Sequence, residues 1–234
     1  MQFDGTQKLI GTGAQAEVFL YEGYAYKVYK PTYPAEWIAF EKSQQKAVND
    51  ARLCSVRYYD TDDEHIIKMD FVDGEMLEKR ALTGDITCFN TLADAFRFVH
   101  NTDATGINMP LLKDTAGMGL SDAESDEVLE IITRLSDKEK NCVCHLDMHF
   151  LNIMLPRDKA DYVIIDWMNA RLAPAVFDYA RTYVIFDEFS KEGLEAYKAI
   201  VLPDLWATGI KETDFMDAVR ACAIIRKREK NETE

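Results

Sequence analysis

The spacing of hydrophobic residues changes at about residues 70–75, and this change limits the folds open to the chain. Before it, runs such as AEVFLYE, YAYKVYK and HIIKMDFV are typical of strands, and a helix-forming stretch follows Pro34. After it, TCFNTLADAFRFVHNT and SDAESDEVLEIITRL have helical spacing, the second opening with Ser121 and Glu124 as a capping box. We expect an α+β chain with an N-terminal lobe (1–72), a mainly helical C-terminal lobe (73–234) and a hinge at 70–75. The first lobe should hold a five-stranded antiparallel sheet and one helix.

Composition narrows the classes of partner. The chain has 27 basic and 41 acidic residues, a net charge of −14, which argues against a nucleic-acid groove. It has no run of 18 apolar residues, so we expect no membrane-spanning helix. The five cysteines follow no export signal, and we expect reduced thiols in a cytoplasmic protein.

Polar residues are concentrated in the apolar segment CVCHLDMHFLNIML. Asp147 and Asn152 stand five positions apart around a loop, and Asn152 precedes the apolar run IML. A further acid, Asp166, ends the apolar run YVII, where a strand would present it at a sheet edge. Each acid alone is compatible with a turn or a cap, but the combined spacing favours a shared site for chemistry.

Two further features precede this segment. The loop GTGAQA, residues 11–16, offers backbone N–H groups that a ligand can approach closely. Lys27 stands in the middle of an expected strand, and Glu41 lies on the helix that follows. Taken singly, the loop indicates only a turn, and the lysine only an exposed strand position.

Taken together, these motifs resemble the aminoglycoside phosphotransferase family. The order G-x-G-x-x-A-x-V, Lys27, Glu41, H-x-D-x-H-x-x-N and I-D-W spans about residues 8–185. The family, which also includes choline kinases, is a branch of the protein-kinase-like fold. The resemblance implies a small-molecule kinase that moves the γ-phosphate of ATP or GTP to a hydroxyl group of a small acceptor, with Mg²⁺.

The resemblance also implies a role for each matching residue. Lys27 would contact the nucleotide phosphates while paired with Glu41, although Glu36 on the same helix is an alternative partner. The implied residues are Asp147, Lys27 and Glu41 for catalysis; Gly11, Gly13, Ala14, Lys27, Asp70 and Val72 for nucleotide binding; Asn152 and Asp166 for the metal; and His149 and Asp178 in support.

The sequence departs from the family pattern at two of these motifs. Ala16 replaces the third glycine of the loop, and Leu146 stands where the family prefers glycine. The catalytic Asp and Asn are unaffected, but the second change bears on the rim where the acceptor would dock.

Three alternatives remain open from the sequence. A zinc site could be built from Cys142, Cys144, His145 and His149, although no paired metal-ligand spacing is present. A catalytically silent kinase-like module, binding nucleotide or a protein, would have the same motifs. A true protein kinase is disfavoured because D-F-G and A-P-E are missing.

Two acidic stretches bear on the charge of the acceptor. Acidic residues are dense at 114–130 and recur at Asp187, Glu188 and Glu192, in regions that form the acceptor site in the family. Acids near helix starts are also ordinary features that favour the helix dipole and solubility. If they face the acceptor, the acceptor should be a cation.

Overall fold

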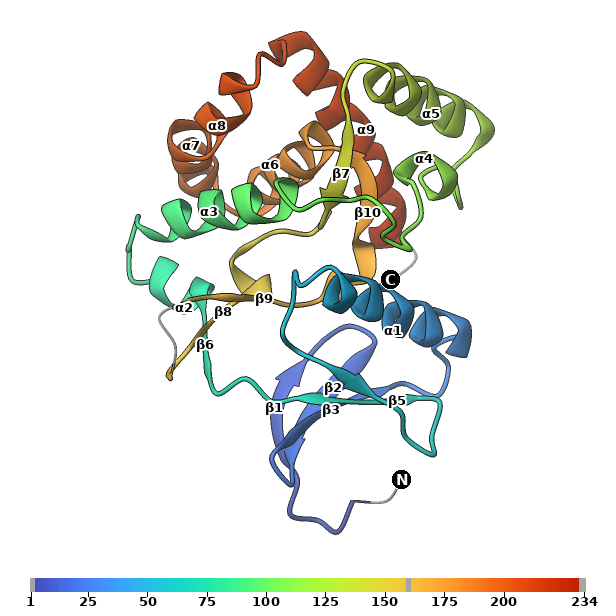
Figure 1. The fold of residues 1–234 in the computed structure, drawn as a ribbon, viewed down its shortest axis with the longest axis vertical. Coiled ribbons are helices and arrows are strands. Elements are labelled where there is room, and N and C mark those ends of the chain that lie inside the picture. Colours follow the sequence, from blue (N-terminus) through green and yellow to red (C-terminus); the bar gives the residue numbers. More distant parts are fainter. Residues whose placement is uncertain (1–2, 159–160, 232–234) are drawn as a thin grey trace.

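The computed structural model describes residues 3–158 and 161–231, which form an antiparallel sheet region below and a helical region above in Figure 1. The strands are β1 Lys8–Thr12, β2 Ala16–Tyr21, β3 Tyr24–Tyr29, β4 Tyr58–Tyr59, β5 Ile66–Asp70, β6 Gly74–Met76, β7 Asn141–Cys144, β8 Ile153–Pro156, β9 Val163–Ile164 and β10 Arg171–Pro174. The helices are α1 Ala35–Asp50, α2 Leu77–Ala81, α3 Cys88–His100, α4 Leu112–Thr115, α5 Asp122–Ser136, α6 Val176–Phe189, α7 Lys191–Ile200, α8 Leu202–Ala207 and α9 Glu212–Asn231, with 3-10 turns η1 Phe150–Asn152 and η2 Trp167–Asn169.

The N-terminal sheet has five strands in the order β1-β2-β3-β5-β4, all antiparallel. Its β2–β3 hairpin turns at Glu22 and Gly23, whose φ angles of 47° and 79° are both positive, as a tight type I′ turn requires. In this register Lys27 lies opposite Val18 on one side and Ile67 on the other. The expected five-stranded sheet with one helix is confirmed.

Helix α1 connects the sheet to the helical region. Its residue Ile38 packs in a small core with Ile67, whereas Ala47 and Val48 belong to the large core of the helical region. The Gln44 amide donates a hydrogen bond to the carbonyl of Ala170, a residue more than a hundred positions away. Because α1 packs against both regions, the position of its side chains, Glu41 among them, is fixed relative to the loops of the C-terminal region.

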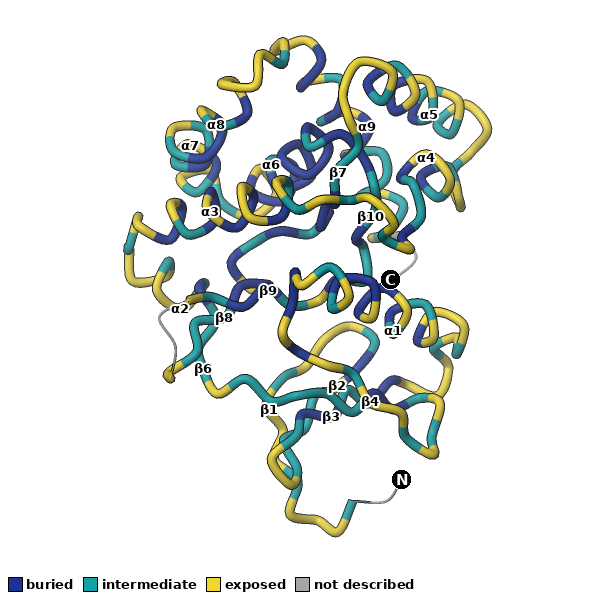
Figure 2. The backbone as a smooth tube through the Cα atoms, in the orientation of Figure 1, coloured by how far each residue is buried: buried dark blue, intermediate teal, exposed yellow. Residues whose placement is uncertain are grey.

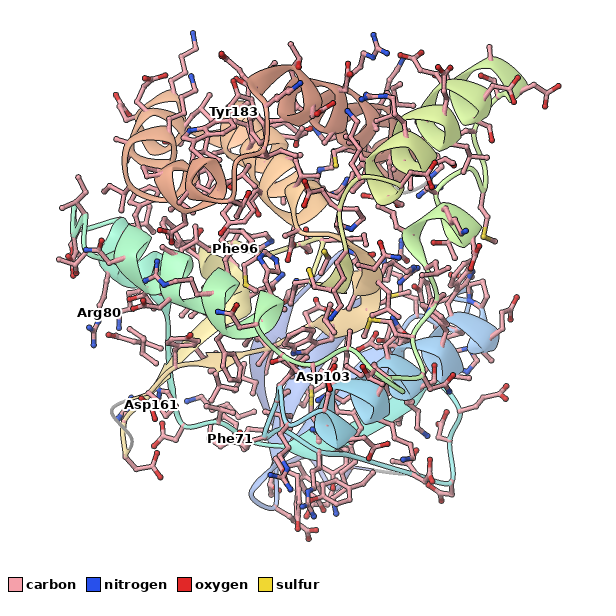
Figure 3. All side chains as sticks on the ribbon, turned by 45° about the horizontal axis from the view of Figure 1, so that its top comes forward. Phe71, Arg80, Phe96, Asp103, Asp161 and Tyr183 are labelled. Carbon is pink, nitrogen blue, oxygen red and sulfur yellow. The ribbon has the colours of Figure 1, made fainter. Side chains whose placement is uncertain are left out.

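The chain passes between the two regions at residues 71–73, and Figure 3 labels Phe71 there. Asp70 ends β5, whereas Gly74 begins β6, which pairs with β8 in a separate three-stranded sheet. A Cβ at Gly74 would lie 2.4 Å from the Leu155 carbonyl oxygen, so this close strand approach requires glycine. A hinge at 70–75 remains our prediction for the boundary of the lobes.

Helix α6 forms the centre of the helical region, and Figure 2 shows it as mostly buried. It contacts α9, α7, α8 and β10, and Tyr179 on α6 stacks on Phe96 of α3 at 4.5 Å between ring centroids. The predicted capping box at Ser121 and Glu124 opens α5. No helix in the described ranges 3–158 and 161–231 is both long and apolar enough to cross a membrane.

Candidate active site

The glycine loop joins β1 to β2. The Gly13 N–H donates to the Ala16 carbonyl at 2.8 Å, which closes the turn, and Ala14 lies within it. Gly11 and Gly13 do not have positive φ angles, and a Cβ at either would meet its nearest neighbour at an ordinary 3.5 Å. The fold itself therefore tolerates alanine at both positions. Glycine there leaves bare backbone exposed to a ligand, as the sequence suggested.

Lys27 reaches Glu41 across the gap between β3 and α1. Its Nζ lies 2.8 and 3.0 Å from the two carboxylate oxygens of Glu41 and 4.0 Å from Asp166 Oδ1. Burial lowers the pKa of Lys27, but the negative charges of Asp166 and Glu41 outweigh it and hold this pKa well above its ordinary value. Glu36 is exposed, and Glu41 is the partner.

Glu41 is 2% exposed and would be costly to bury without several partners. Besides Lys27, the hydroxyl groups of Tyr29 and Tyr58 donate hydrogen bonds to it. Burial raises the pKa of both tyrosines, and the charge of Glu41 raises it further, so both remain donors. No sequence motif singles out these tyrosines, because an aromatic residue in a strand is an ordinary packing residue.

The loop between β7 and η1 is held from below by α6. Asp178, which is fully buried, accepts hydrogen bonds from the N–H groups of His145 at 2.9 Å and Leu146 at 2.8 Å. His100 Nε2 lies 2.9 Å from the same carboxylate. One turn further along α6, the Thr182 hydroxyl donates to the Met148 carbonyl at 2.7 Å. Thr182 lies four residues after Asp178 on the same helix face, so this spacing is a sequence signal for its role.

Leu146 adopts a left-handed conformation, with φ of 59°. Glycine reaches this region without steric cost, which explains the family preference at this position. In this chain, the hydrogen bond from Leu146 N–H to Asp178 and the burial of the leucine side chain hold the conformation. The departure from the family pattern therefore leaves the loop geometry in place.

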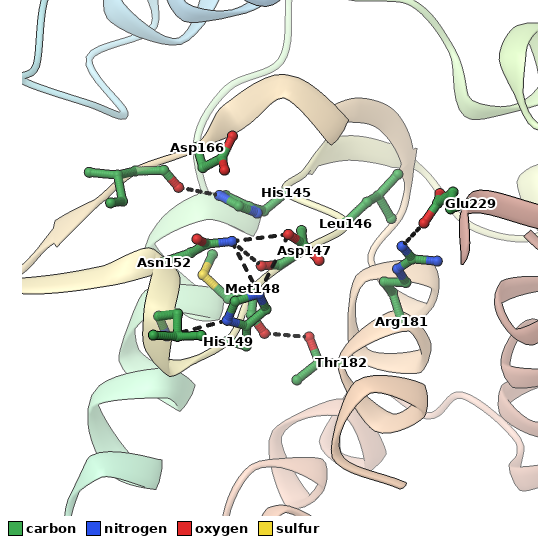
Figure 4. Close-up of polar contacts among 12 residues, drawn as sticks. His145, Leu146, Asp147, Met148, His149, Asn152, Asp166, Arg181, Thr182 and Glu229 are labelled. Atoms are coloured by element: carbon green, nitrogen blue, oxygen red, sulfur yellow. Dashed lines mark hydrogen bonds and ion pairs between the residues drawn. The ribbon is translucent and has the colours of Figure 1, made fainter. Parts of the chain in front are cut away.

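Asp147, His149 and Asn152 contact one another within this loop (Figure 4). Asn152 Nδ2 donates to the Asp147 carbonyl at 2.8 Å and to Asp147 Oδ2 at 3.1 Å. The Leu151 N–H donates to His149 Nδ1, and the other ring nitrogen, Nε2, lies 3.5 Å from Asp147 Oδ2. Burial raises the pKa of Asp147, but the hydrogen bond with His149 and the charges of His149 and Arg181 lower it more. The pKa therefore lies well below its ordinary value, and the carboxyl group is ionised.

Asn152 and Asp166 supply oxygen donors from two adjacent strands. The Ile165 N–H donates to the Asn152 carbonyl at 2.9 Å, which places Asp166 next to this loop. Since the Asn152 amide nitrogen donates to Asp147, its Oδ1 is the side-chain atom that could bind a metal ion. The Asp166 side chain is 46% exposed. Two hard oxygen donors with open positions beside them fit Mg²⁺ better than zinc.

The connecting segment was predicted to meet the nucleotide base through Asp70 and Val72. The Asp70 carboxylate accepts from the Arg57 N–H at 2.9 Å and from the Tyr59 hydroxyl at 2.9 Å, so it braces β4 against β5. Val72 is half-buried and packs against the large core. A contact with the base by the backbone of this segment remains our prediction.

The four residues of the alternative zinc site do not assemble. His145 Nε2 bonds to the Ile165 carbonyl at 3.0 Å, and His149 faces Asp147. Within the described residues, the cysteine pair gathers instead with His100, and the Cys142 and Cys144 sulfurs lie 3.9 Å apart. The zinc alternative is therefore wrong for the predicted set, and His145 is buried against Trp167 instead.

A cavity of about 780 Å³ lies beside α1 and β4. None of the predicted site residues lines it, so the size of a cavity does not locate the site. The candidate site lies instead around Lys27, which contacts Glu41 of α1 and lies 4.0 Å from Asp166. The bonds from Ile165 to Asn152 and from Asn152 to Asp147 connect this place to the loop after β7.

Comparison with known proteins agrees with this geometry. The profile of the phosphotransferase enzyme family matches residues 6–209. Choline kinase LicA from Streptococcus pneumoniae superposes with a TM-score of 0.64 at 16% identity, covering 96% of this chain and 84% of that one. LicA in complex with AMP gives a TM-score of 0.66 at 15% identity, covering 99% and 86%. An aminoglycoside-3'-phosphotransferase of type VIII gives 0.64 at 16% identity, covering 95% and 93%.

The search among curated proteins found no match. The structural likeness identifies the protein-kinase-like fold, with an antiparallel sheet in the N-terminal region and helices in the C-terminal region. The family profile covers most of the chain, including every motif discussed above. The chain belongs to the phosphotransferase enzyme family.

Proposed function

We propose that this protein is a small-molecule kinase that transfers the γ-phosphoryl group of ATP or GTP to a hydroxyl group of its acceptor. One observation supports this most strongly: Lys27 Nζ lies 2.8 Å from Glu41 and 4.0 Å from Asp166, three residues with no proximity in the sequence. A lysine fixed by one buried acid and directed at a second is arranged to meet phosphate oxygens beside a metal ligand.

On the acceptor side, Asp147 is the reacting group. Its lowered pKa keeps it ionised, so it accepts a hydrogen bond from the acceptor hydroxyl and orients the oxygen toward the γ-phosphorus. As the new oxygen–phosphorus bond forms and the bond to the bridging β–γ oxygen breaks, the hydroxyl proton passes to Asp147 and then to solvent. Asn152 and His149 hold the carboxylate in place throughout.

On the nucleotide side, the N–H groups of loop 13–15 and the Lys27 ammonium bind the phosphates. Asn152 Oδ1 and the Asp166 carboxylate would hold Mg²⁺, which supplies positive charge to the transferring phosphoryl group. Transfer has a loose transition state, so positioning and charge neutralisation provide most of the rate. The AMP complex of LicA supports the use of a nucleotide in this fold.

The proposal is tested by incubating the protein with ATP or GTP, Mg²⁺ and a panel of hydroxylated compounds, and measuring nucleoside diphosphate together with phosphorylated acceptor. We expect stoichiometric formation of both with at least one acceptor, and none from Asp147→Asn. Nucleotide binding without acceptor-dependent turnover across the panel would favour a silent kinase-like module instead.

A further inference from the structure

A small cavity of about 80 Å³ lies beside the loop that contains Asp147. It is bounded by that loop, by the segment after Asp166, and by helices α4, α6 and α9. Figure 4 shows Arg181 rising from α6 toward Leu146 and Glu229 at this place. The residues that matter for its chemistry are Leu146, Asn169, Arg171, Arg181, Arg228 and Glu229.

Positive charge dominates the lining although the whole chain has a net charge of −14. Three arginines line the cavity against one acid, Glu229. Glu229 is itself shared, because it forms an ion pair with Arg181 and also lies 3.6 Å from Arg228 Nη2. With Asp147 behind Leu146 counted as well, the charges near the cavity still sum to +1 (three arginines against two acids).

Arg181 is buried, and one of its hydrogen-bond donors has no partner. The residue is 3% exposed, and its Nε–H, itself buried, has no hydrogen-bond acceptor. Buried donors are almost always paired, and one that is not usually marks a place where a ligand or water completes the bonding. A guanidinium presents its donors as a planar fork that fits the paired oxygens of a carboxylate or phosphate.

Arg171, which also lines the cavity, has no carboxylate partner among the described residues. Its donors bond to the Thr115 hydroxyl at 2.9 Å and to the carbonyl oxygens of Ala170 at 2.8 Å and Met168 at 3.1 Å. Burial lowers the pKa of Arg171 to about 10, against the charge of Glu229, which raises it. The Arg171 guanidinium thus bonds to neutral oxygen atoms, which do not cancel its positive charge, so it can attract an anion.

We propose that this cavity binds an anionic group of the acceptor, a carboxylate or a phosphate, while the acceptor hydroxyl faces Asp147. The inference rests on the proposed kinase function and names the class of substrate: small hydroxylated anions. Leu146 lines the cavity, Asp147 follows it directly, and the charge of the cavity residue Arg181 lowers the pKa of Asp147. The cavity and the Asp147 carboxylate are therefore close enough for one compact acceptor to meet both. Arg171 and Arg181 provide the recognition, and Glu229 keeps the empty cavity from excess positive charge.

Two acids from the stretches that favoured a cationic acceptor are paired with basic residues of α9. Glu127 on α5 lies 2.8 Å from Arg220, and Glu188 on α6 lies 2.9 Å from Lys230 and 3.2 Å from Arg226. These pairs join α5 and α6 to α9. A cationic and an anionic acceptor are opposite predictions, and one set of measurements separates them.

The experiment uses calorimetry on the full chain with Mg²⁺ and a non-hydrolysable ATP analogue present. The probes are glycerate and glycerol phosphate, with glycerol and choline as neutral and cationic counterparts. We expect both anionic probes, or one of them, to bind more tightly than glycerol and choline. Arg171→Gln should weaken that binding about tenfold or more, Arg171→Lys should weaken it less, and Arg220→Gln, an exposed arginine on α9, should leave it unchanged.

Arg181→Gln should act in the same direction, and Arg171→Gln carries the test if the buried variant does not fold. Binding of choline but of neither anion, or an Arg171→Gln protein that binds the anions as well as the wild type, would overturn the inference. Absence of binding of both anionic probes would overturn it too. Failure to bind the ATP analogue would instead overturn the proposed function, so the two failures are distinguishable.

Discussion

At the scale of single residues, two of the strained positions of this chain lie at the candidate site. Leu146 and Asp166 have φ angles of 59° and 62°, in a region that costs a residue other than glycine roughly 1–2 kcal/mol. Strain of this size persists only where the surroundings fix it, and it gathers at functional sites. Here Asp178 fixes Leu146 through its N–H, which directs the following Asp147 away from the core.

Asp147→Asn preserves the shape of this loop and removes only the charge. An amide still accepts from Asn152 but no longer takes up the proton of an acceptor hydroxyl, so we expect turnover to fall about 10²- to 10⁴-fold. Nucleotide affinity should change little, because in the proposed function Asp147 contacts the acceptor and not the nucleotide. Steady-state kinetics and nucleotide titration on the same preparation check both statements, and an Asn variant as fast as the wild type would remove the role.

Gly13→Ala separates ligand approach from fold. Neither φ nor space requires glycine at this position, so the free energy of unfolding should stay within about 1 kcal/mol of the wild type. The added methyl group should nevertheless weaken nucleotide binding, because it occupies the surface that the phosphates approach. Gly74→Ala is the matched control: its Cβ would lie 2.4 Å from a backbone oxygen, and we expect destabilisation without a specific loss of nucleotide affinity in the folded fraction. Equal nucleotide affinity for Gly13→Ala and the wild type would contradict the assignment.

At the scale of elements, α6 organises the site by holding the loop after β7 at two points. Asp178 accepts from His145, Leu146 and His100, and Thr182 donates to Met148. The contact with His100 also joins α3 to α6, so one carboxylate ties two helices to the loop. The sequence indicated Asp178 only through the family resemblance, since a buried acid in a helix carries no periodic signal of its own.

The bond between His100 and Asp178 should make stability depend on pH. Burial lowers the pKa of His100, but Asp178 raises it more, so the pKa in the folded protein lies above the ordinary value. When the pKa of a histidine is higher in the folded protein, its protonation stabilises the fold. This stabilisation is complete at pH values below the unfolded pKa of about 6.5 and is lost as the pH rises through the pKa of the folded protein. Wild type should therefore exceed His100→Gln in stability most at pH 6, and the difference should shrink toward pH 8.

Denaturant unfolding of both proteins at several pH values measures this difference. Arg220→Gln, far from the pair, should show the same pH dependence as the wild type. A difference between wild type and His100→Gln that stays constant from pH 6 to pH 8 would show that the His100 charge does not stabilise the fold.

At the scale of the whole molecule, the sequence predicted the division of structure but not the contacts across it. Alternation and helical spacing were enough for the five strands, the single N-terminal helix and the capped α5, because those signals are local. The order of the strands and the bond from Gln44 to Ala170 depend on packing between distant segments, and no pattern marks them. The pair of Lys27 and Glu41 was implied by resemblance. The three arginines of the cavity come from three different elements, β10, α6 and α9, and have no shared sequence signature.

The central claim is that Asn152 and Asp166 hold magnesium for a nucleotide bound under the glycine loop. The direct measurement is calorimetric titration of ATP analogue, with and without Mg²⁺, into wild type, Asp166→Asn and the exposed control Asp158→Asn. We expect Mg²⁺ to strengthen binding to wild type and to Asp158→Asn. In Asp166→Asn this gain should fall by at least about 10-fold. That factor is the smallest loss typical when a residue behind a metal ligand is removed, and loss of a direct ligand should cost no less. The same magnesium-dependent gain in Asp166→Asn as in the wild type would contradict the claim.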